Sequence, residues 1–136
     1  MSIIVEFFAA TSQEAPAAPE SGPGLGWPGF SCGNFDAYEA LLGWEAAVTE
    51  RPWRALLDAG VPTLVAGDEA RPMVVQASDT LRAWLAGASA HEIAWLTDTW
   101  GPRAGVHPEA GVDILTSLAE LALETGGSSG IYCWVA

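Results

Sequence analysis

Two apolar stretches decide the expected fold: Ser2-Ile3-Ile4-Val5-Glu6-Phe7-Phe8-Ala9 near the start of the chain and Ile131-Tyr132-Cys133-Trp134-Val135-Ala136 at its end. Both are rich in β-branched and aromatic residues, and the second follows a Gly/Ser-rich break over 126–130, so each predicts a β-strand. Both faces of the first strand are mostly apolar, which is typical of a strand covered on both sides. Strands this apolar promote aggregation when they stay unpaired. We therefore expect both ends of the chain to lie in one sheet as neighbours.

The composition limits the class of protein. The chain has 136 residues, half of them hydrophobic, and its mean hydropathy is +0.23. This apolar content excludes a disordered acidic tail and favours one folded domain over residues 1–136. Five basic residues, all arginine, stand against 17 acidic ones, which gives a net charge of −12 at pH 7. Nucleic-acid binding is not expected, because it needs a cationic surface.

The ends and the cysteines indicate the compartment. No stretch approaches the roughly 20 apolar residues that cross a bilayer, and the start of the chain lacks the basic residues of a secretion signal. The two cysteines, Cys32 and Cys133, are too far apart in sequence for a CxxC redox or zinc motif. We therefore expect a cytoplasmic protein with reduced thiols and with no metal, cofactor or membrane partner. A disulfide between Cys32 and Cys133 would require that the fold brings their strands together.

The middle of the chain adds a hairpin to the sheet. Residues 61–66 and 72–76 predict two short strands around a turn at 67–70. A Pro/Gly-rich loop is expected over 13–30, either as a solvated loop or as a lid over a site. Together with the two ends, these segments predict an α+β fold whose small mixed sheet is covered by about five helices.

Capping residues and breakers mark the ends of these helices. Asn34 is predicted to cap the first helix, over 35–50. Ser89 and Glu92 form a capping box for the fourth, which is expected to break at Gly101-Pro102. The other three helices are expected to start at Pro52, after Ser78 and at Pro108, the last continuing to about residue 125.

Glu45 is the most informative candidate for chemistry. On the 35–50 helix it falls within roughly 30° of the centre of the apolar arc. That arc is defined by Phe35, Tyr38, Leu41, Leu42, Ala46 and Val48. A carboxylate there needs a partner, a proton or a pocket, because an unpaired buried charge is very costly. Either it has a structural partner, such as an arginine, or it serves a pocket in proton transfer or cation binding. Its neighbour Gly43 costs about 1 kcal/mol relative to alanine in a helix, which a close approach by another backbone or by a ligand would explain.

Glu6 raises the same question in the first strand. If Glu6 and Glu45 faced one cavity, they would form a carboxylate pair with separated proton affinities, and we take both as the candidate catalytic residues. His91 is expected to be exposed in the second position of its helix, and His107 to be a boundary residue at a helix start. Neither has metal-ligand spacing to a Cys, Asp or Glu. No nucleophile motif or phosphate-binding loop is present.

Seven tryptophans exceed the number usual for a core of this size. Trp44 and Trp95 fall off the apolar arcs of their helices, so we expect them to be exposed. Tryptophan is enriched at binding hot spots. The candidate residues for binding a ligand or a partner are Trp44, Trp95, Trp27 and Tyr38.

The chain resembles a group of short uncharacterised actinobacterial proteins. The resemblance rests on the start Ser2-Ile3-Ile4-Val5-Glu6-Phe7-Phe8-Ala9-Ala10, on the helix entry Gly33-Asn34-Phe35-Asp36 and on the ending Tyr132-Cys133-Trp134. These patterns span the chain and favour one small domain. They imply no activity.

We expect a non-enzymatic binding protein. Its acidic, tryptophan-rich surface would bind a protein partner or a small cationic or aromatic ligand, and the negative charge would speed association with a basic partner. The competing hypothesis is a small pocket enzyme that uses Glu45 and Glu6 in carboxylate acid–base chemistry. The sequence leaves open whether the chain is an enzyme and whether it forms a homodimer.

Overall fold

A five-stranded sheet forms the centre of the computed structural model, which describes residues 4–17, 27–33, 35–67, 72–125 and 129–136. Its strands lie in the order β2-β1-β5-β4-β3 and all four pairings are antiparallel, so the sheet is antiparallel rather than mixed. The bounds are Ile4–Thr11 (β1), Gly29–Gly33 (β2), Thr63–Gly67 (β3), Met73–Gln76 (β4) and Ser129–Val135 (β5). The predicted α+β fold, with a sheet made from both chain ends and a middle hairpin, is confirmed.

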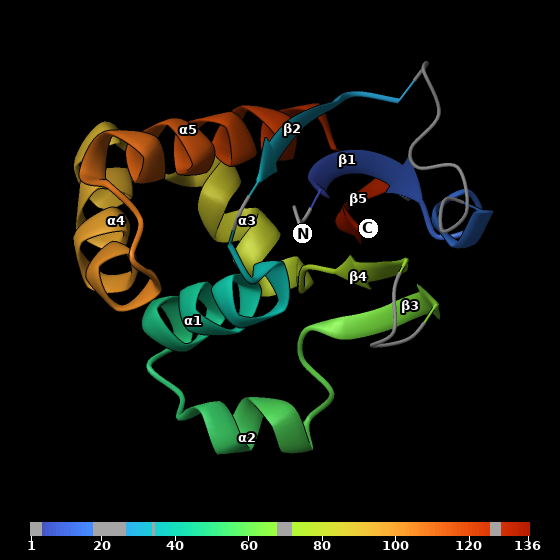
Figure 1. Cartoon of the computed structure of the whole chain (residues 1–136), viewed down its shortest axis with the longest axis horizontal. Helices are drawn as coiled ribbons and strands as arrows, with labels where there is room; N and C mark the ends of the chain where they lie inside the picture. The colour runs from blue at the N-terminus through green and yellow to red at the C-terminus, as the bar shows by residue number, and fades with distance from the viewer. Residues whose placement is uncertain (1–3, 18–26, 34, 68–71, 126–128) are drawn as a thin grey trace.

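The two ends of the chain pair directly. β1 and β5 are paired from Val5 opposite Val135 to Thr11 opposite Ser129. The Ile4 and Ala136 backbones extend the ladder with two reciprocal N–H···O bonds of 2.9 Å. Figure 1 accordingly shows β1 and β5 side by side in the sheet. Their apolar character on both faces is explained, because β1 and β5 are inner strands of the sheet.

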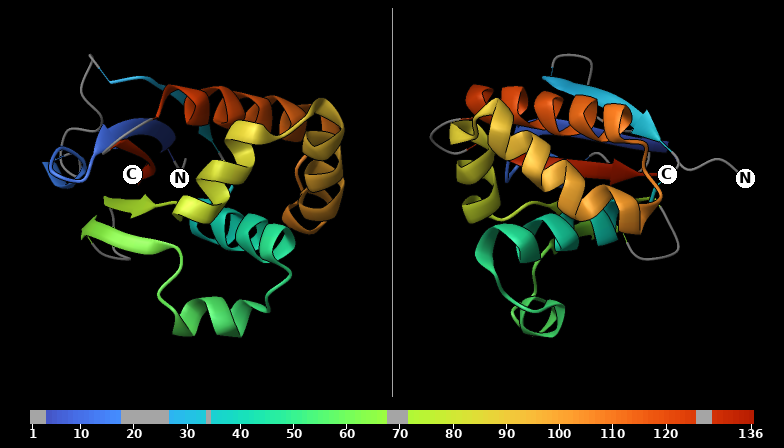
Figure 2. Two further views of the ribbon diagram at one scale, coloured as in Figure 1. Left: turned by 180° about the vertical axis from the view of Figure 1, so that it is seen from behind. Right: turned by 90° about the vertical axis from the view of Figure 1, so that its left-hand side faces the viewer.

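Five helices accompany the sheet. They span Ala37–Thr49 (α1), Trp53–Asp58 (α2), Asp79–Gly87 (α3), Ala90–Ala104 (α4) and Pro108–Glu124 (α5), and a 3₁₀ turn, η1, spans Ala15–Ala17. The four longer helices α1, α3, α4 and α5 lie on one side of the sheet (Figures 1 and 2). There α4 packs mainly on α1 and α5. The short helix α2 lies at the edge of the molecule, next to α1.

The sheet separates two apolar clusters of unequal size. Val5, Phe7 and Ala9 of β1 face the helices and belong to the large cluster. Phe8 and Ala10 point to the other side, where they join Tyr132 and a few further residues in a small cluster. This alternation along β1 follows from the two-residue period of a strand, and it decides on which side each β1 side chain lies.

Local signals set most of the helix ends. The Ser78 and Ser89 hydroxyls accept from the N–H groups of Leu81 and Glu92, and Glu92 completes the predicted capping box. At α5, the His107 ring nitrogen Nδ1 accepts from the Glu109 N–H at 3.3 Å. His107 is therefore a boundary residue, as predicted.

Three local predictions need correction. α1 begins after Asp36, whose side chain is the N-cap, so it starts later than the predicted residue 35; Asn34 lies outside the described residues. α4 continues through Gly101 and Pro102 to Ala104. Pro102 is tolerated because it sits in the last turn, where its missing N–H removes a single helical bond.

The third correction concerns the loop predicted over residues 13–30, which contains η1 and the start of β2. β2 is a short edge strand bounded by glycines and bonded only to β1, so its signal in the sequence is weak. The residues between η1 and Trp27 lie outside the described part of the chain.

The two cysteines remain thiols. Cys32 of β2 lies opposite Val5, and Cys133 of β5 lies opposite Phe7, so β1 separates the two. Neighbouring strands are about 4.8 Å apart, which places the two Cα atoms beyond the roughly 7 Å that a disulfide can span. Burial raises the pKa of the Cys32 thiol to about 12 and that of Cys133 well above its ordinary value.

Within the described residues, no helix is both long and apolar enough to cross a bilayer.

Candidate ligand-binding cleft

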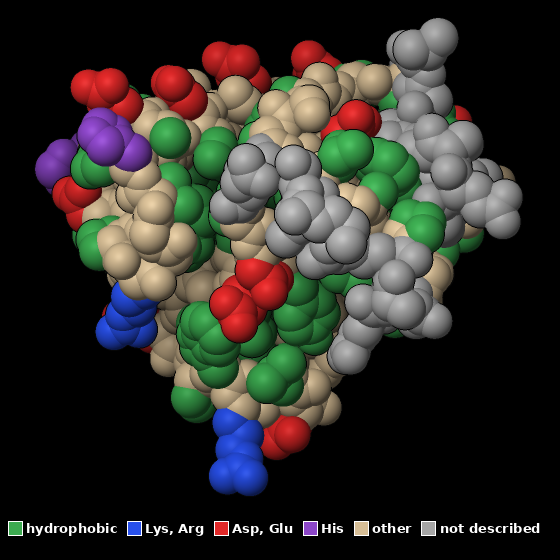
Figure 3. Space-filling model, viewed as in Figure 1, with side chains coloured by type: hydrophobic (Ala, Val, Ile, Leu, Met, Phe, Trp, Pro, Cys, Tyr) green, Lys and Arg blue, Asp and Glu red, His purple; other side chains and the backbone are tan. Residues whose placement is uncertain are grey.

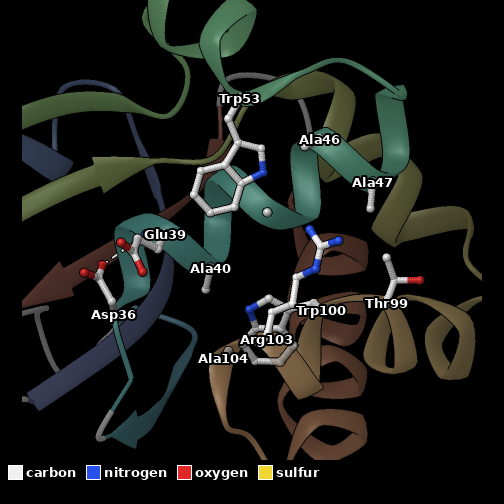
Figure 4. Close-up of a pocket in the computed structure, with 11 residues that line it drawn as sticks. Asp36, Glu39, Ala40, Ala46, Ala47, Trp53, Thr99, Trp100, Arg103 and Ala104 are labelled. Atoms are coloured by element: carbon white, nitrogen blue, oxygen red, sulfur yellow. Dashed lines mark hydrogen bonds between the residues drawn. The ribbon is translucent and has the colours of Figure 1, made fainter.

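A cleft of about 450 Å³ lies between α1, the start of α2 and the end of α4 (Figure 4). Its lining combines small side chains, two indole rings and three charged groups. The lining residues are Asp36, Glu39, Ala40, Gly43, Ala46, Ala47, Trp53, Thr99, Trp100, Arg103 and Ala104.

One side of α1 forms the floor of the cleft. The lining positions 36, 39–40, 43 and 46–47 recur every three to four residues, so they share one side of the helix. Alanine and glycine occupy all of these positions after Glu39, and such small side chains leave the space open. The cleft therefore exists because this side of α1 carries no bulky side chain.

Two tryptophans converge on Gly43 from different helices. A Cβ atom added at Gly43 would lie 3.5 Å from Cδ1 of Trp100 and 3.7 Å from Cζ2 of Trp53. The sum of the two distances limits the separation of these ring atoms to about 7 Å. Because carbon atoms pack at about 3.5 Å, nothing thicker than one planar group could lie between them. An alanine methyl group would therefore meet both rings at ordinary contact distance, so the predicted close approach is present but does not by itself require a glycine inside α1.

The two rings differ in how firmly they are held. Trp100 is only 6% exposed and packs edge-to-face on Trp44, with ring centroids 5.0 Å apart, and on Phe35 at 5.8 Å. Trp53 is 42% exposed at the first position of α2. Trp100 thus provides a rigid wall, whereas Trp53 provides an accessible one.

Charged groups of opposite sign occupy different parts of the cleft. Asp36 and Glu39 lie together at the N-terminal end of α1, whereas Arg103 reaches from the last turn of α4 toward Ala46 and Ala47 (Figure 4). One oxygen of Asp36, Oδ1, accepts from the Glu39 N–H at 3.0 Å. Both carboxylates and Arg103 are exposed at the rim.

Glu45 is buried, as predicted, but it does not line this cleft. It is two residues beyond Gly43, about 200° around the helix, so its side chain leaves α1 on the opposite side. Only 3% of Glu45 is exposed, and its Oε2 has no hydrogen-bond partner among the described residues. The predicted structural partner, an arginine, is therefore not seen at this oxygen.

Glu6 and Glu45 do not form a pair. Glu6 lies between Val5 and Phe7 in β1, so its side chain points away from the face on which those two residues meet the helices. α1 packs on that helical face, where Trp44 contacts Phe7 at a centroid distance of 6.0 Å. The sheet thus separates the two carboxylates, and the shared cavity that the sequence analysis considered is not formed.

The predicted binding aromatics lie in four different environments. Trp44 is fully buried, which corrects the prediction that it is exposed. Trp95 is 46% exposed on α4, as predicted, with its ring centroid 6.2 Å from that of Trp84. Trp27 stacks on Phe8 at 5.3 Å on the far side of the sheet, and Tyr38 is half-buried beside the large cluster. None of the four lines the cleft.

The sequence analysis missed the residues that do form the cleft. Trp100 was assigned to the apolar side of its helix, and Trp53 to a short helix without a role. Arg103 was treated as one of several scattered arginines. The available signal was the run of small residues at 40, 43, 46 and 47, which marks a side of α1 that leaves space rather than filling it.

Acidic side chains dominate other parts of the surface. Glu109, Asp113, Glu120 and Glu124 are exposed and fall within about 60° on α5, so they form a stripe along that helix. Figure 3 shows a row of acidic groups along the edge where α5 lies. Within the described part of the chain, one ion pair is formed, between Arg82 and Asp79 at 3.7 Å. The field around the protein is therefore negative.

Across the described ranges, no three His, Cys, Asp or Glu side chains are grouped closely enough to hold a metal ion.

Comparison of the chain with known protein families, with characterised proteins and with solved structures gives no match. The resemblance to actinobacterial proteins therefore stays a prediction, and the function is argued from the cleft itself.

Proposed function

We propose that this protein binds a small ligand, without catalysing a reaction, and that the ligand places a planar aromatic group and a neighbouring positive charge in the cleft between α1, α2 and α4. The observation that carries the proposal is the convergence of Trp53 and Trp100 on Gly43, since both rings come within 3.7 Å of the position that a Cβ atom would take there. A planar group in the cleft beside Gly43 would contact both rings and the small side chains of α1.

The energetics favour an aromatic group with a positive charge beside it. Aromatic pairs contribute about 0.5–1.5 kcal/mol beyond the area that they bury, and a cation near an indole face adds a similar amount. The carboxylates of Asp36 and Glu39 lie on the same cleft and attract a positive charge. The net charge of −12 raises the local concentration of cations near the surface.

The alternative, a pocket enzyme that uses Glu45 and Glu6, has less support. The two carboxylates lie on opposite sides of the sheet, and neither lines the cleft. The acids that do line it, Asp36 and Glu39, are exposed, and Asp36 is engaged in capping α1. General acid–base catalysis relies on carboxyls whose environment tunes their pKa, and a solvated capping residue is poorly suited to that role.

Titration with tryptamine, an indole that carries an ammonium group, tests the proposal. We expect saturable amide shift changes in an NMR titration, centred on Gly43, Ala40 and Ala47, with a Kd in the millimolar range typical of one small aromatic fragment. The matched probe 2-cyclohexylethylamine has the same charge without a planar ring, and it should bind at least about 5-fold more weakly.

A pair of tryptophan variants provides the control. Trp53→Ala removes one wall of the cleft and should weaken tryptamine binding about 5- to 10-fold. Trp95→Ala removes a tryptophan of similar exposure that lies outside the cleft, so affinity should be unchanged. Equal effects of the two variants, or shift changes that are not centred on α1, would exclude this cleft as the binding site.

A further inference from the structure

The cleft carries charges of opposite sign at opposite ends. Asp36 and Glu39 lie at the N-terminal end of α1, and the Arg103 side chain points toward Ala46 and Ala47 (Figure 4). Seven residues separate Glu39 from Ala46, which corresponds to about 10 Å along the helix axis. The indoles of Trp53 and Trp100 lie between the two ends, at Gly43.

These charges do not neutralise one another. Among the described residues, Arg103 makes no ion pair with a carboxylate, and Asp36 and Glu39 make no ion pair with an arginine. All three groups are exposed to water, which weakens their mutual attraction. Each end is therefore available to a group of opposite charge on a ligand.

From this arrangement we infer the class of ligand: a zwitterion about 10 Å long, with a cationic group at one end, an anionic group at the other and a planar aromatic group in the middle. This inference rests on the proposed function, and it adds the anionic end and the orientation. The cation faces Asp36 and Glu39, the aromatic group stacks over Gly43, and the anion pairs with the Arg103 guanidinium.

A tripeptide with free ends has these dimensions. An extended chain spans about 3.3–3.6 Å per residue, so three residues place an ammonium and a carboxylate about 10 Å apart. Gly-Trp-Gly carries its indole at the centre and no other charged group. It is therefore the probe that matches the cleft in charge order, length and planarity.

Blocking one end at a time separates the contributions of the two charges. N-acetyl-Gly-Trp-Gly lacks the cation, Gly-Trp-Gly-amide lacks the anion, and Gly-Leu-Gly keeps both charges without the ring. By calorimetry or NMR titration we expect each blocked peptide to bind about 2- to 5-fold more weakly than Gly-Trp-Gly, as for exposed ion pairs. Gly-Leu-Gly should bind about 5- to 10-fold more weakly.

Protein variants assign each charge to its residue. Arg103→Gln should weaken binding of Gly-Trp-Gly and its acetylated form but leave the amide unchanged, because the amide has no anion to lose. Glu39→Gln should weaken binding of Gly-Trp-Gly and the amide but leave the acetylated form unchanged. Glu120→Gln on α5 removes an exposed acid outside the cleft and should affect none of the peptides.

The outcomes distinguish the two proposals. If all three tryptophan peptides bind with equal affinity at α1 and Gly-Leu-Gly does not, the aromatic site stands and the zwitterion is wrong. If Arg103→Gln weakens the amide as much as the free peptide, Arg103 acts through the fold and not through an anion. If neither tryptamine nor any tryptophan peptide binds at α1, the proposed function fails as well.

Discussion

The two sides of α1 differ in the size of their side chains more than in their polarity. The buried side carries Leu41, Trp44 and Glu45, so it includes a carboxylate among large apolar groups. Beyond Glu39, the cleft side carries alanines and Gly43. A binding surface on this helix is therefore marked by missing volume as well as by the charged residues at the rim of the cleft.

Truncation on the buried side should cause the largest loss. Trp44→Ala removes a fully buried ring that packs on Phe7 and Trp100, so we expect the free energy of unfolding to fall by about 3–5 kcal/mol. Urea denaturation followed by circular dichroism measures it. Trp53→Ala, on the cleft side, should cost less than about 1 kcal/mol because the ring is largely exposed. Similar losses for both variants would contradict the division of α1 into a core side and a cleft side.

The reactivity of the two thiols measures whether water reaches the face of the sheet that the helices cover. Burial raises the pKa of Cys32 to about 12 and that of Cys133 well above its usual value, so alkylation by iodoacetamide at pH 8 should be at least about 100-fold slower than in concentrated guanidinium chloride. The unfolded thiol ionises near pH 9, so stability should fall as pH rises from about 9 toward 12. Cys32→Ala should flatten this fall. Equal rates in the folded and unfolded states would show that the thiols are open to solvent.

Replacement of Glu45 tests whether its buried carboxylate has a structural role. Because its Oε2 is buried without a partner among the described residues, Glu45→Met should stabilise the fold, by about 1–2 kcal/mol. Thermal unfolding measures the change, and Glu39→Met on the exposed rim is the matched control with little expected effect. A loss of stability in Glu45→Met would mean that the carboxylate has a partner in solution.

Gly43 should give the smallest change in stability, with opposite effects on folding and binding. Gly43→Ala should raise stability by up to about 1 kcal/mol, because alanine favours the helix and its methyl group meets both indoles at ordinary contact distance. The same methyl group narrows the cleft where the planar ligand would lie against Gly43, so tryptamine affinity should fall severalfold. Unchanged affinity would place the ligand elsewhere in the cleft.

The sheet could be predicted from the sequence because its signals are local. The ends of the chain are apolar on both faces, and a strand with that pattern has to lie inside a sheet. The caps at Ser78 and Ser89 were predictable for the same reason, since each depends on residues within one turn. β2 was missed because its glycine-rich sequence has little strand propensity, and its pairing depends on β1.

The error at Trp44 has a different origin. The predicted apolar arc of the first helix included Phe35, which precedes the Asp36 cap, and Ala46, which faces the cleft. These two residues rotated the centre of the arc by about 40° away from Trp44. A helix boundary that is wrong by two residues thus contributed to placing a core tryptophan on the surface.

The cleft itself could not be predicted, because it depends on tertiary packing. It requires that α2 and α4 bring Trp53 and Trp100 to the same glycine, and these residues are far apart in sequence. The glycine indicated that something approaches α1 closely, but not which side chains do so. Only the packing of three helices assigns the tryptophans and Arg103 to one site.

The pairing of β1 with β5 also has a consequence for synthesis on the ribosome. β5 follows β1 by about 120 residues, which at 5–20 residues per second delays their pairing by on the order of ten seconds. During that time β1 has only β2 to pair with, and one of its edges stays open. A nascent chain of this kind would gain most from a chaperone that covers this apolar strand until β5 has been made.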